Sequence, residues 1–325
     1  VVLPWHLAHD RADASGAPGT AGASGQTALG TTGRGIGPCY TDKACRRGFR
    51  LVDLLEAGPA LADLLQPAYD AHARELAGKA LPPFPELIST LRQHLDVLSP
   101  MVGDTRAFLE RMMVQRRSLL FEGAQGTMLD LDHGTYPFVP SSTTTLAGVF
   151  AGSGLPPQLV NRVIGVLKPY TTRVGHGPFP TEQANDTGER IRQRGREFGT
   201  TTGRPRRCGW LDLVALRYAL EVNGVTEIAL TKLDIMSQEP VIPVCLHYQA
   251  GDRKYHHFPA GSRIFGELTP HYLEIPGWTE DLTQCRSFLD LPTAAINFVE
   301  TLEQLTKLPV TLISVGPERS QLITR

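Results

Sequence analysis

The sequence lacks an excess of charge of either sign and lacks any long apolar run. Its 325 residues include 32 lysines and arginines and 33 aspartates and glutamates, for a formal net charge of −1. A balanced charge creates no global field that would attract nucleic acid, and no apolar stretch reaches the length of a membrane span. We therefore expect no nucleic-acid or membrane partner.

Closely spaced cysteine pairs and a secretory signal are also missing. The five cysteines form no C-x-x-C pair, and a small, odd, scattered set of thiols is typical of reduced proteins of the cytosol. No signal peptide is recognisable, so we expect a cytoplasmic protein. The hydrophobic share of 41% and the charged share of 20% are ordinary for a globular protein with a large core.

Short apolar runs alternate along the chain with segments of helical periodicity. This alternation predicts an α/β fold with a mainly parallel central sheet flanked by helices. The helices over about 51–117 are expected to form a helical insertion within a single domain, residues 1–325, and strands over 241–248 and 254–258 a small antiparallel element. The expected buried strands span 118–123, 163–170, 227–231 and 309–316, and the expected helices span 51–65, 85–98, 105–117, 146–151, 186–198, 213–223 and 292–308.

Two polar residues follow the strand at 227–231. Lys232 and Asp234 lie just past its carboxyl end, which is where open α/β sheets bind ligands. An aspartate there can accept from N1–H and the exocyclic amine of guanine, and the lysine stem can cover the base while its ammonium stays solvated. Alone, a K-x-D sequence is more often a solvated loop pair. Its position after a strand, downstream of an arginine-rich loop at 199–207, favours base recognition.

A glycine-rich segment at 30–48 and a polar loop at 124–137 are weaker signals. Gly33, Gly35 and Gly37 would let backbone N–H groups approach an anion, although a glycine-rich surface loop explains the pattern equally well. His133 beside Asp132 could be a base with its orienting carboxylate, but polar groups that only hold a long loop are the more frequent case. With Asp130 these two side chains could also suggest a metal cluster, but their spacing fits no standard template.

Seven motifs in order together resemble the adenylosuccinate synthetase family. They are GTTGRGIGP, FEGAQG, DHGTYPFV, TTRVGHGPFPTE, TTGRPRRCGW, TKLD and SVGPER, and they span nearly the whole chain. The resemblance implies a GTP-dependent ligase that joins IMP to L-aspartate. GTP phosphorylates the 6-oxygen of IMP, and the aspartate amine then displaces that phosphate, which yields adenylosuccinate, GDP and phosphate.

The resemblance also implies the site residues, a cofactor and an assembly. Mg²⁺ is the expected cofactor, and a homodimer is expected because Arg46 corresponds to an arginine that reaches the IMP of the partner subunit. The implied IMP contacts are Thr32, Arg46, Gln125 and Arg204. The implied aspartate-binding loop comprises Thr200, Thr201, Thr202, Gly203, Arg204 and Arg206. The implied GTP contacts are Arg206, Lys232, Leu233, Asp234, Ser314, Val315 and Gly316.

The sequence departs from the family pattern in three places. The family's glycine-rich phosphate loop, its catalytic aspartate and its catalytic histidine are not in this chain, so we expect an N-terminally incomplete polypeptide with an exposed sheet edge and a tendency to aggregate. Pro140 replaces an IMP-contacting threonine and supplies neither hydroxyl nor N–H, although Ser141 could substitute. Val315 replaces a threonine of the last GTP loop. A non-catalytic purine-nucleotide-binding paralogue or an inactive fragment is therefore the alternative.

Overall fold

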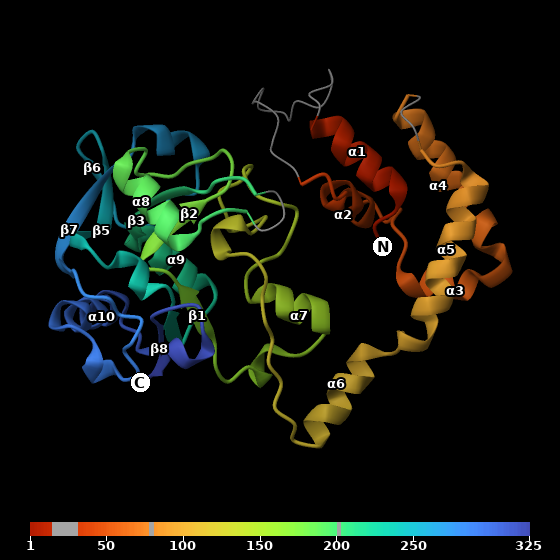
Figure 1. The fold of residues 1–325 in the computed structure, drawn as a ribbon. Helices are drawn as coiled ribbons and strands as arrows, with labels where there is room; N and C mark the ends of the chain where they lie inside the picture. Colours follow the sequence, from red (N-terminus) through yellow and green to blue (C-terminus); the bar gives the residue numbers. More distant parts are fainter. Residues whose placement is uncertain (15–31, 78–80, 200–202) are drawn as a thin grey trace. The chain divides into compact units, whose positions relative to one another are not determined.

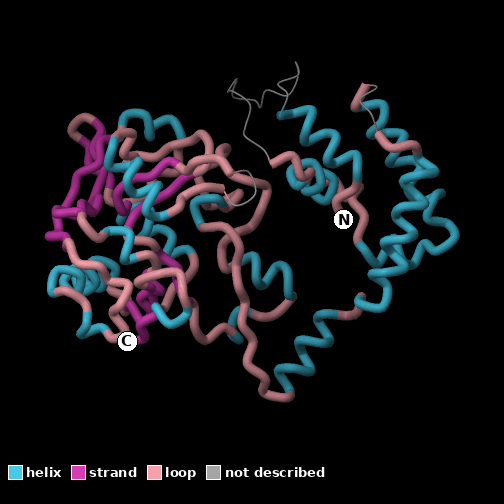
Figure 2. The backbone as a smooth tube through the Cα atoms, in the orientation of Figure 1, coloured by secondary structure: helices cyan, strands magenta, loops and turns pink. Residues whose placement is uncertain are grey.

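The computed structural model describes residues 1–14, 32–77, 81–199 and 203–325, and the chain divides into two compact units. Unit 1 comprises Val1–Glu122 with Pro137–Thr143, and unit 2 comprises Gly123–Tyr136 with Thr144–Arg325. All described strands belong to unit 2 (Figure 2). The expected helical insertion lies within unit 1, and a single domain stays a prediction.

Unit 1 is built from helices around a core of leucines and one tryptophan. The helices are α1 (Pro4–Ala14), α2 (Ile36–Ala44), α3 (Leu51–Ala57), α4 (Leu61–Glu75), α5 (Phe84–Leu98) and α6 (Thr105–Val114) (Figure 1). Trp5, Leu54 and Leu65 are almost fully buried in this core. The sequence pattern missed α1 and α2. The helix expected over 51–65 is divided because Gly58 adopts a φ of 49°, which ends α3 before α4 begins.

Unit 2 contains a four-stranded and a five-stranded sheet. In the first, β1 (Ile164–Leu167), β4 (Glu227–Leu230) and β8 (Val310–Ser314) run parallel and β9 (Leu322–Thr324) closes one edge antiparallel, in the order β1-β4-β8-β9. Every residue of β4 is buried. The mainly parallel central sheet expected from the sequence is confirmed.

The second sheet is larger and more antiparallel than the expected hairpin. It joins β2 (Tyr170–Arg173), β3 (Arg207–Asp212), β5 (Glu239–Ala250), β6 (Arg253–Tyr255) and β7 (Thr269–Trp278). The hairpin of β5 and β6 is confirmed, whereas the sequence pattern missed β3 and β7. The helices of unit 2 are α7 (Ala147–Ser153), α8 (Asp186–Gly195), α9 (Leu213–Val222) and α10 (Thr293–Thr306).

Helix α9 follows β3 without a loop because Asp212 caps it. The Asp212 carboxylate accepts from the backbone N–H groups of Val214 and Ala215, both at 3.1 Å, and from the Tyr248 hydroxyl at 2.6 Å. Gly224, with a φ of 55°, follows the last turn as expected. The helix and its ends agree with the sequence prediction.

Three other expectations are wrong. Residues 118–123 form no strand, and Leu120 is 89% exposed, since no described segment pairs with this backbone. The run 163–170 forms β1 and the start of β2, and β1 is an edge strand with Val166 exposed rather than a buried one. The hydroxyl-rich segment 140–145 is expected to supply the N-cap of α7, but Leu146 occupies the N-cap position and makes no side-chain hydrogen bond.

All five cysteines are free thiols. Among the described residues, no helix combines the length and apolarity that a membrane span requires.

Candidate functional site

Two loops leave the four-stranded sheet at the carboxyl ends of two neighbouring strands. Strands β4 and β8 are parallel neighbours, with Leu230 opposite Ile313, so the segments after them begin side by side. Lys232–Asp234 follows β4, and Ser314–Gly316 ends and follows β8. The two segments expected at strand ends from the sequence are thus brought together.

The backbone after β4 is fixed by Lys232 and Leu233. Lys232 adopts a φ of 60°, and Leu233, which is fully buried, begins a 3-10 helix (Leu233–Met236). The Lys232 ammonium donates to the carbonyl of Gly195 at 2.7 Å and to Glu197 Oε1 at 2.9 Å. The Lys232 side chain is 38% exposed, so its ammonium binds a buried carboxylate while the side chain remains partly in solvent.

Glu197 is the centre of this network and is fully buried. Its Oε1 accepts from Lys168 at 3.0 Å, from Lys232 and from the Tyr170 hydroxyl at 2.6 Å, while its Oε2 accepts from Arg206 at 2.7 Å. Burial by itself raises the pKa of the Glu197 carboxyl, but the hydrogen bonds from Tyr170 and Lys232 and the charge of Lys168 outweigh it and lower the pKa to about 2. The group is therefore a carboxylate at neutral pH.

The arginine loop is closed at its base. The N–H of Arg206 donates to the carbonyl of Glu197 at 2.9 Å, and the N–H of Gly199 donates to the carbonyl of Arg204 at 2.8 Å. Arg207 binds the Glu182 carboxylate and donates to the carbonyl of Gly177 at 2.9 Å. Arg206 and Arg207 are thus paired with carboxylates of the protein. The side chain of Arg204 is exposed. Thr200, Thr201 and Thr202 lie outside the described residues.

Asp234 carries an acceptor that the fold leaves unused. Its Oδ1 is buried and has no hydrogen-bond partner among the described residues. Burial raises the pKa of this carboxyl, against the opposing effects of a backbone hydrogen bond and of Lys232. A buried acceptor without a partner costs free energy, which is typical of a group that a ligand completes.

The segment after β8 presents backbone rather than side chains. Ser314 donates from Oγ to the carbonyl of Gly316 at 2.9 Å, and Val315 is fully buried while its N–H donates to the carbonyl of Gln321 at 3.0 Å. A Cβ on Gly316 would lie 2.3 Å from Gln321 Oε1, so a larger residue here would require the Gln321 side chain to move. Val315, which replaces the family's threonine, is buried in the core of unit 2.

The glycine-rich segment of unit 1 packs on α1. A Cβ on Gly35 would lie 2.8 Å from the backbone of His6, and the N–H of Gly35 donates to Asp10 Oδ2 at 2.7 Å. One of the amides proposed for an anion is therefore occupied by a carboxylate. Thr32 and Arg46 are both exposed, and Arg46 adopts a φ of 62°.

Pro140 lies in the segment of unit 1 that also approaches the glycines. A Cβ on Gly37 would be 3.6 Å from the Oγ of Ser141. Ser141 is therefore placed beside the glycine-rich segment, next to the proline that replaces the family's threonine.

The loop 124–137 is held by Asp130, as in the more frequent of the two cases considered for its polar residues. Asp130 is buried and accepts from the backbone N–H groups of Asp132 and His133. His133 Nδ1 lies 3.2 Å from the Tyr218 hydroxyl. This favours the loop-holding interpretation, and within the described ranges these residues do not group as a metal site. Gln125 is exposed, with a φ of 67°.

The sequence analysis missed Glu197, Lys168 and Tyr170. Lys168 and Tyr170 flank the break between β1 and β2, and Glu197 follows α8. The only sequence signal was a lone glutamate in an arginine-rich stretch, and such residues are usually solvated. Their convergence depends on strands that are distant in sequence.

Comparison with known proteins identifies the family to which the chain belongs. The sequence matches the family described as adenylosuccinate synthetase over residues 1–323. The adenylosuccinate synthetase of Halothermothrix orenii is 44% identical, over 100% of this chain and 75% of the relative, and that of Desulforudis audaxviator is 48% identical, over 91% and 69%. A fully ligated adenylosuccinate synthetase from Plasmodium falciparum superposes with a TM-score of 0.91 at 35% identity, covering 98% of this chain and 75% of that one. This chain belongs to the adenylosuccinate synthetase family.

Proposed function

We propose that this chain acts in the GTP-dependent joining of IMP and L-aspartate to give adenylosuccinate, GDP and phosphate, through a 6-phosphoryl-IMP intermediate. The observation that carries the proposal is the buried Asp234 Oδ1 without a hydrogen-bond partner in the described part of the chain, at the carboxyl end of β4. Guanine presents two adjacent donors that match a carboxylate. The function places this step in the AMP branch of purine biosynthesis.

GTP is recognised by three segments in this proposal. Asp234 accepts from the guanine edge, the stem of Lys232 lies along the base, and the backbone of Ser314–Gly316 flanks it. Leu233 and Val315 anchor these loops by their burial. Arg206 contributes positive charge toward the phosphates, and Glu197 positions both Arg206 and Lys232.

L-Aspartate binds the loop 200–206 in this proposal. The resemblance to the family assigns Arg204 to this substrate, and its side chain is exposed. A planar guanidinium suits a dicarboxylate better than an ammonium does.

IMP is assigned Thr32, Gln125, Arg204 and, from the partner subunit of a homodimer, an arginine equivalent to Arg46. The exposure of Arg46 at a tight turn supports a role outside its own unit. Five free thiols support a reducing, cytoplasmic setting.

Mg²⁺ is used by the family, but the residues around this nucleotide site do not fit a resident ion. Mg²⁺ prefers carboxylates together with phosphate oxygens. Glu197 is engaged by Lys168, Lys232 and Arg206. We therefore assign no side chain of this site to Mg²⁺.

Nucleotide binding without turnover is the second candidate. Pro140 removes a hydroxyl, and His133, the histidine of the polar loop, is bound to Tyr218 rather than poised with Asp132. The resemblance places the family's catalytic aspartate and histidine outside these 325 residues. Binding and catalysis can therefore separate in this polypeptide.

Calorimetry and a product assay on the 325-residue chain distinguish the candidates. GTP and IMP are titrated separately, and adenylosuccinate formation is then measured with GTP, IMP, L-aspartate and Mg²⁺ present. Binding with turnover supports the ligase, and binding without turnover supports the second candidate. Absence of GTP binding by a folded chain would overturn both. Pro140→Thr should strengthen IMP binding if Ser141 does not already replace the missing contact.

A further inference from the structure

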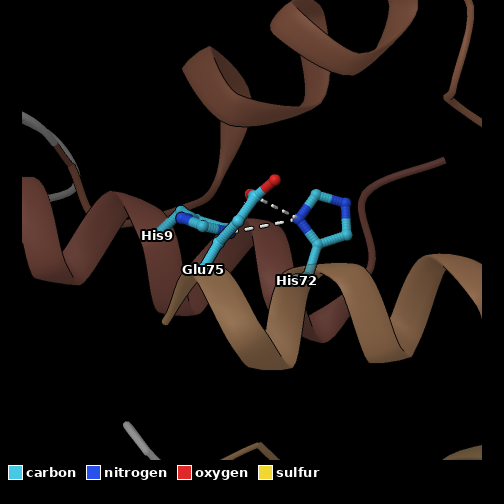
Figure 3. Close-up of side chains that lie close together, drawn as sticks. All are labelled: His9, His72 and Glu75. Carbon is cyan, nitrogen blue, oxygen red and sulfur yellow. Dashed lines mark hydrogen bonds and ion pairs between the residues drawn. The ribbon is translucent and has the colours of Figure 1, made fainter. Parts of the chain in front are cut away.

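A second cluster of chemically competent side chains lies in unit 1, on the helices α1 and α4. His9 comes from α1, and His72 and Glu75 come from α4; the three side chains converge (Figure 3). Nothing in the proposed ligase chemistry uses them. Among the described residues, they form the one group of three or more His, Cys, Asp or Glu side chains whose ligand atoms lie within 4.8 Å of one another.

The distances between the three ligand atoms match a metal coordination sphere. His9 Nε2 lies 3.1 Å from His72 Nδ1 and 3.6 Å from Glu75 Oε2, and His72 Nδ1 lies 3.5 Å from Glu75 Oε2. Tetrahedral ligands at about 2.0–2.1 Å from a zinc ion are separated by roughly 3.3–3.4 Å. All three edges are within a few tenths of an ångström of that value, so an ion fits with small side-chain adjustments.

His72 is held in the orientation and tautomer that metal binding requires. Its Nε2 lies 3.0 Å from the buried Oδ2 of Asp42 and donates to it, which leaves the lone pair on Nδ1 facing His9 and Glu75. The ring also stacks on Trp5, with centroids 5.3 Å apart and planes at 14°. A carboxylate–histidine–metal arrangement of this kind is the usual outer support of a metal-bound imidazole.

Asp42 is itself positioned by a second histidine. The N–H of Leu3 donates to His6 Nδ1 at 2.9 Å, and His6 Nε2 lies 3.0 Å from Asp42 Oδ2 and 3.1 Å from the indole nitrogen of Trp5. Burial lowers the pKa of His6, which keeps the ring neutral. Asp42 Oδ2 thus lies 3.0 Å from an imidazole nitrogen of each of two buried histidines, His6 and His72, which fix its position.

The local charge favours a cation. The group contains the carboxylates of Asp42 and Glu75. The guanidinium of Arg47 lies near both, 3.5 Å from Asp42 Oδ1 and 3.9 Å from Glu75 Oε1. With neutral histidines the group carries one net negative charge. Arg47 approaches Glu75 through Oε1, whereas the histidines face Oε2, so the oxygen assigned to the ion is distinct from the one that faces Arg47.

We propose that His9, His72 and Glu75 bind a first-row divalent cation, with zinc the best match to a His₂Glu ligand set. Three protein ligands leave a fourth position for water, and the Glu75 side chain, 48% exposed, gives that position access to solvent. The ion links α1 to α4 and stabilises unit 1. The competing explanation is a plain hydrogen bond between His9 and His72 with no ion.

Zn²⁺ binding to the full 325-residue chain tests the proposal. Isothermal titration compares the wild type with His9→Asn and Glu75→Gln, and the exposed His94→Asn and Glu86→Gln on α5 serve as matched controls. Cobalt absorption spectra identify the ligands, because exposed thiols such as Cys45 give sulfur-to-metal charge-transfer bands that a His₂Glu site does not. Circular dichroism confirms that each variant is folded.

The expected result is one equivalent of Zn²⁺ that the wild type and both controls bind and that His9→Asn and Glu75→Gln lose. Zn²⁺ should also raise the melting temperature of the wild type but not of Glu75→Gln. Asp42→Asn should weaken binding by about 10- to 100-fold without removing the site. Equal Zn²⁺ stoichiometry and affinity in the wild type and in folded Glu75→Gln would overturn the proposal.

Discussion

Lys232 and Arg206 bind opposite oxygens of one buried carboxylate. The Lys232 ammonium lies 2.9 Å from Glu197 Oε1, and the Arg206 guanidinium lies 2.7 Å from Oε2. One residue comes from the loop after β4 and the other from the arginine loop before β3. Glu197 therefore couples the segment proposed to read the guanine base to the segment proposed to hold the phosphates and L-aspartate.

Glu197→Gln should lower the free energy of unfolding by about 2–3 kcal/mol. Removing one member of a buried ion cluster leaves charges uncompensated, and the penalty is reduced here because the three cations are partly exposed. Urea unfolding followed by tryptophan fluorescence measures the change. Glu189→Gln is the matched control, since Glu189 is half exposed and pairs with Arg192 at the surface; a loss as large in the control would contradict the role of Glu197.

Glu197→Gln should also weaken GTP binding to the folded protein, beyond any loss of binding that partial unfolding causes. Without the carboxylate, Arg206 loses its ion pair and Lys232 keeps only its hydrogen bond to the carbonyl of Gly195, although backbone hydrogen bonds still close the loop at Arg206. Calorimetry at a temperature where the variant is fully folded separates the two effects. Unchanged GTP affinity in folded Glu197→Gln would show that the network serves stability alone.

Stability should fall as the pH is lowered through the range from about 4.5 to 2. The pKa of Glu197 is lowered in the folded state to about 2, from the ordinary glutamate value of 4.5. A carboxyl with a depressed folded pKa stabilises the fold fully above its unfolded pKa, and this contribution disappears as pH falls toward the folded value. The shift corresponds to about 3 kcal/mol.

Urea titrations at several pH values check this dependence. Glu227 contributes in the same range, because hydrogen bonds from Arg162 and Thr311 lower its pKa to about 2 as well. Glu197→Gln should therefore flatten the pH dependence in part and not abolish it. A variant with the same slope as the wild type would show that Glu197 is not the titrating group.

Elements set by local chemistry could be predicted from the sequence. The ends of α9 follow from Asp212 and Gly224, and β4 follows from a short run of apolar residues that is buried on both faces. Because Lys232 and Asp234 come directly after that strand, their position at the carboxyl end of a sheet strand could also be predicted. A strand end is a local property once the strand itself is recognised.

Features that depend on distant neighbours could not be predicted. Residues 118–123 have the composition of a buried strand, but a strand needs a neighbour for its backbone groups, and no described segment supplies one. Glu197 is buried because Lys168, Lys232 and Arg206 converge on it from three places in the chain. The burial of the Glu197 carboxylate and its pairing with Lys232 therefore cannot be read from the sequence.

Asp234→Asn should reduce GTP affinity by roughly 10- to 100-fold while leaving the fold as stable or slightly more so. Hydrogen bonds to a charged group contribute about 1.5–3 kcal/mol, and each 1.4 kcal/mol is a factor of ten in affinity. The stability should not fall because the Oδ1 of Asp234 is buried without a hydrogen-bond partner among the described residues, and burial raises its pKa.

Calorimetry with GTP and thermal melting measure the two effects of Asp234→Asn. Asp252→Asn, at the exposed turn between β5 and β6, is the matched control and should change neither. The asparagine amide is a donor that suits the 2-oxo group of xanthine, so xanthosine triphosphate should bind the variant better than GTP does. Retained GTP affinity in the variant would remove Asp234 from the base site.

Val166→Lys should reduce self-association of the chain. Strand β1 is the edge of its sheet, no described strand pairs with its outer side, and Val166 is 76% exposed. An apolar edge strand is a template for pairing with another chain, and a lysine there opposes such pairing. The stability should change by less than about 0.5 kcal/mol because the side chain is already in solvent.

Light scattering and size-exclusion chromatography of the wild type and variant over a range of concentrations measure the association. Leu289→Lys is the matched control, because Leu289 is 86% exposed but lies in a 3-10 helix (Phe288–Asp290) rather than on a strand. If edge pairing drives association, only the substitution at Val166 lowers it. An equal effect from both substitutions would point instead to a general gain in solubility from added positive charge.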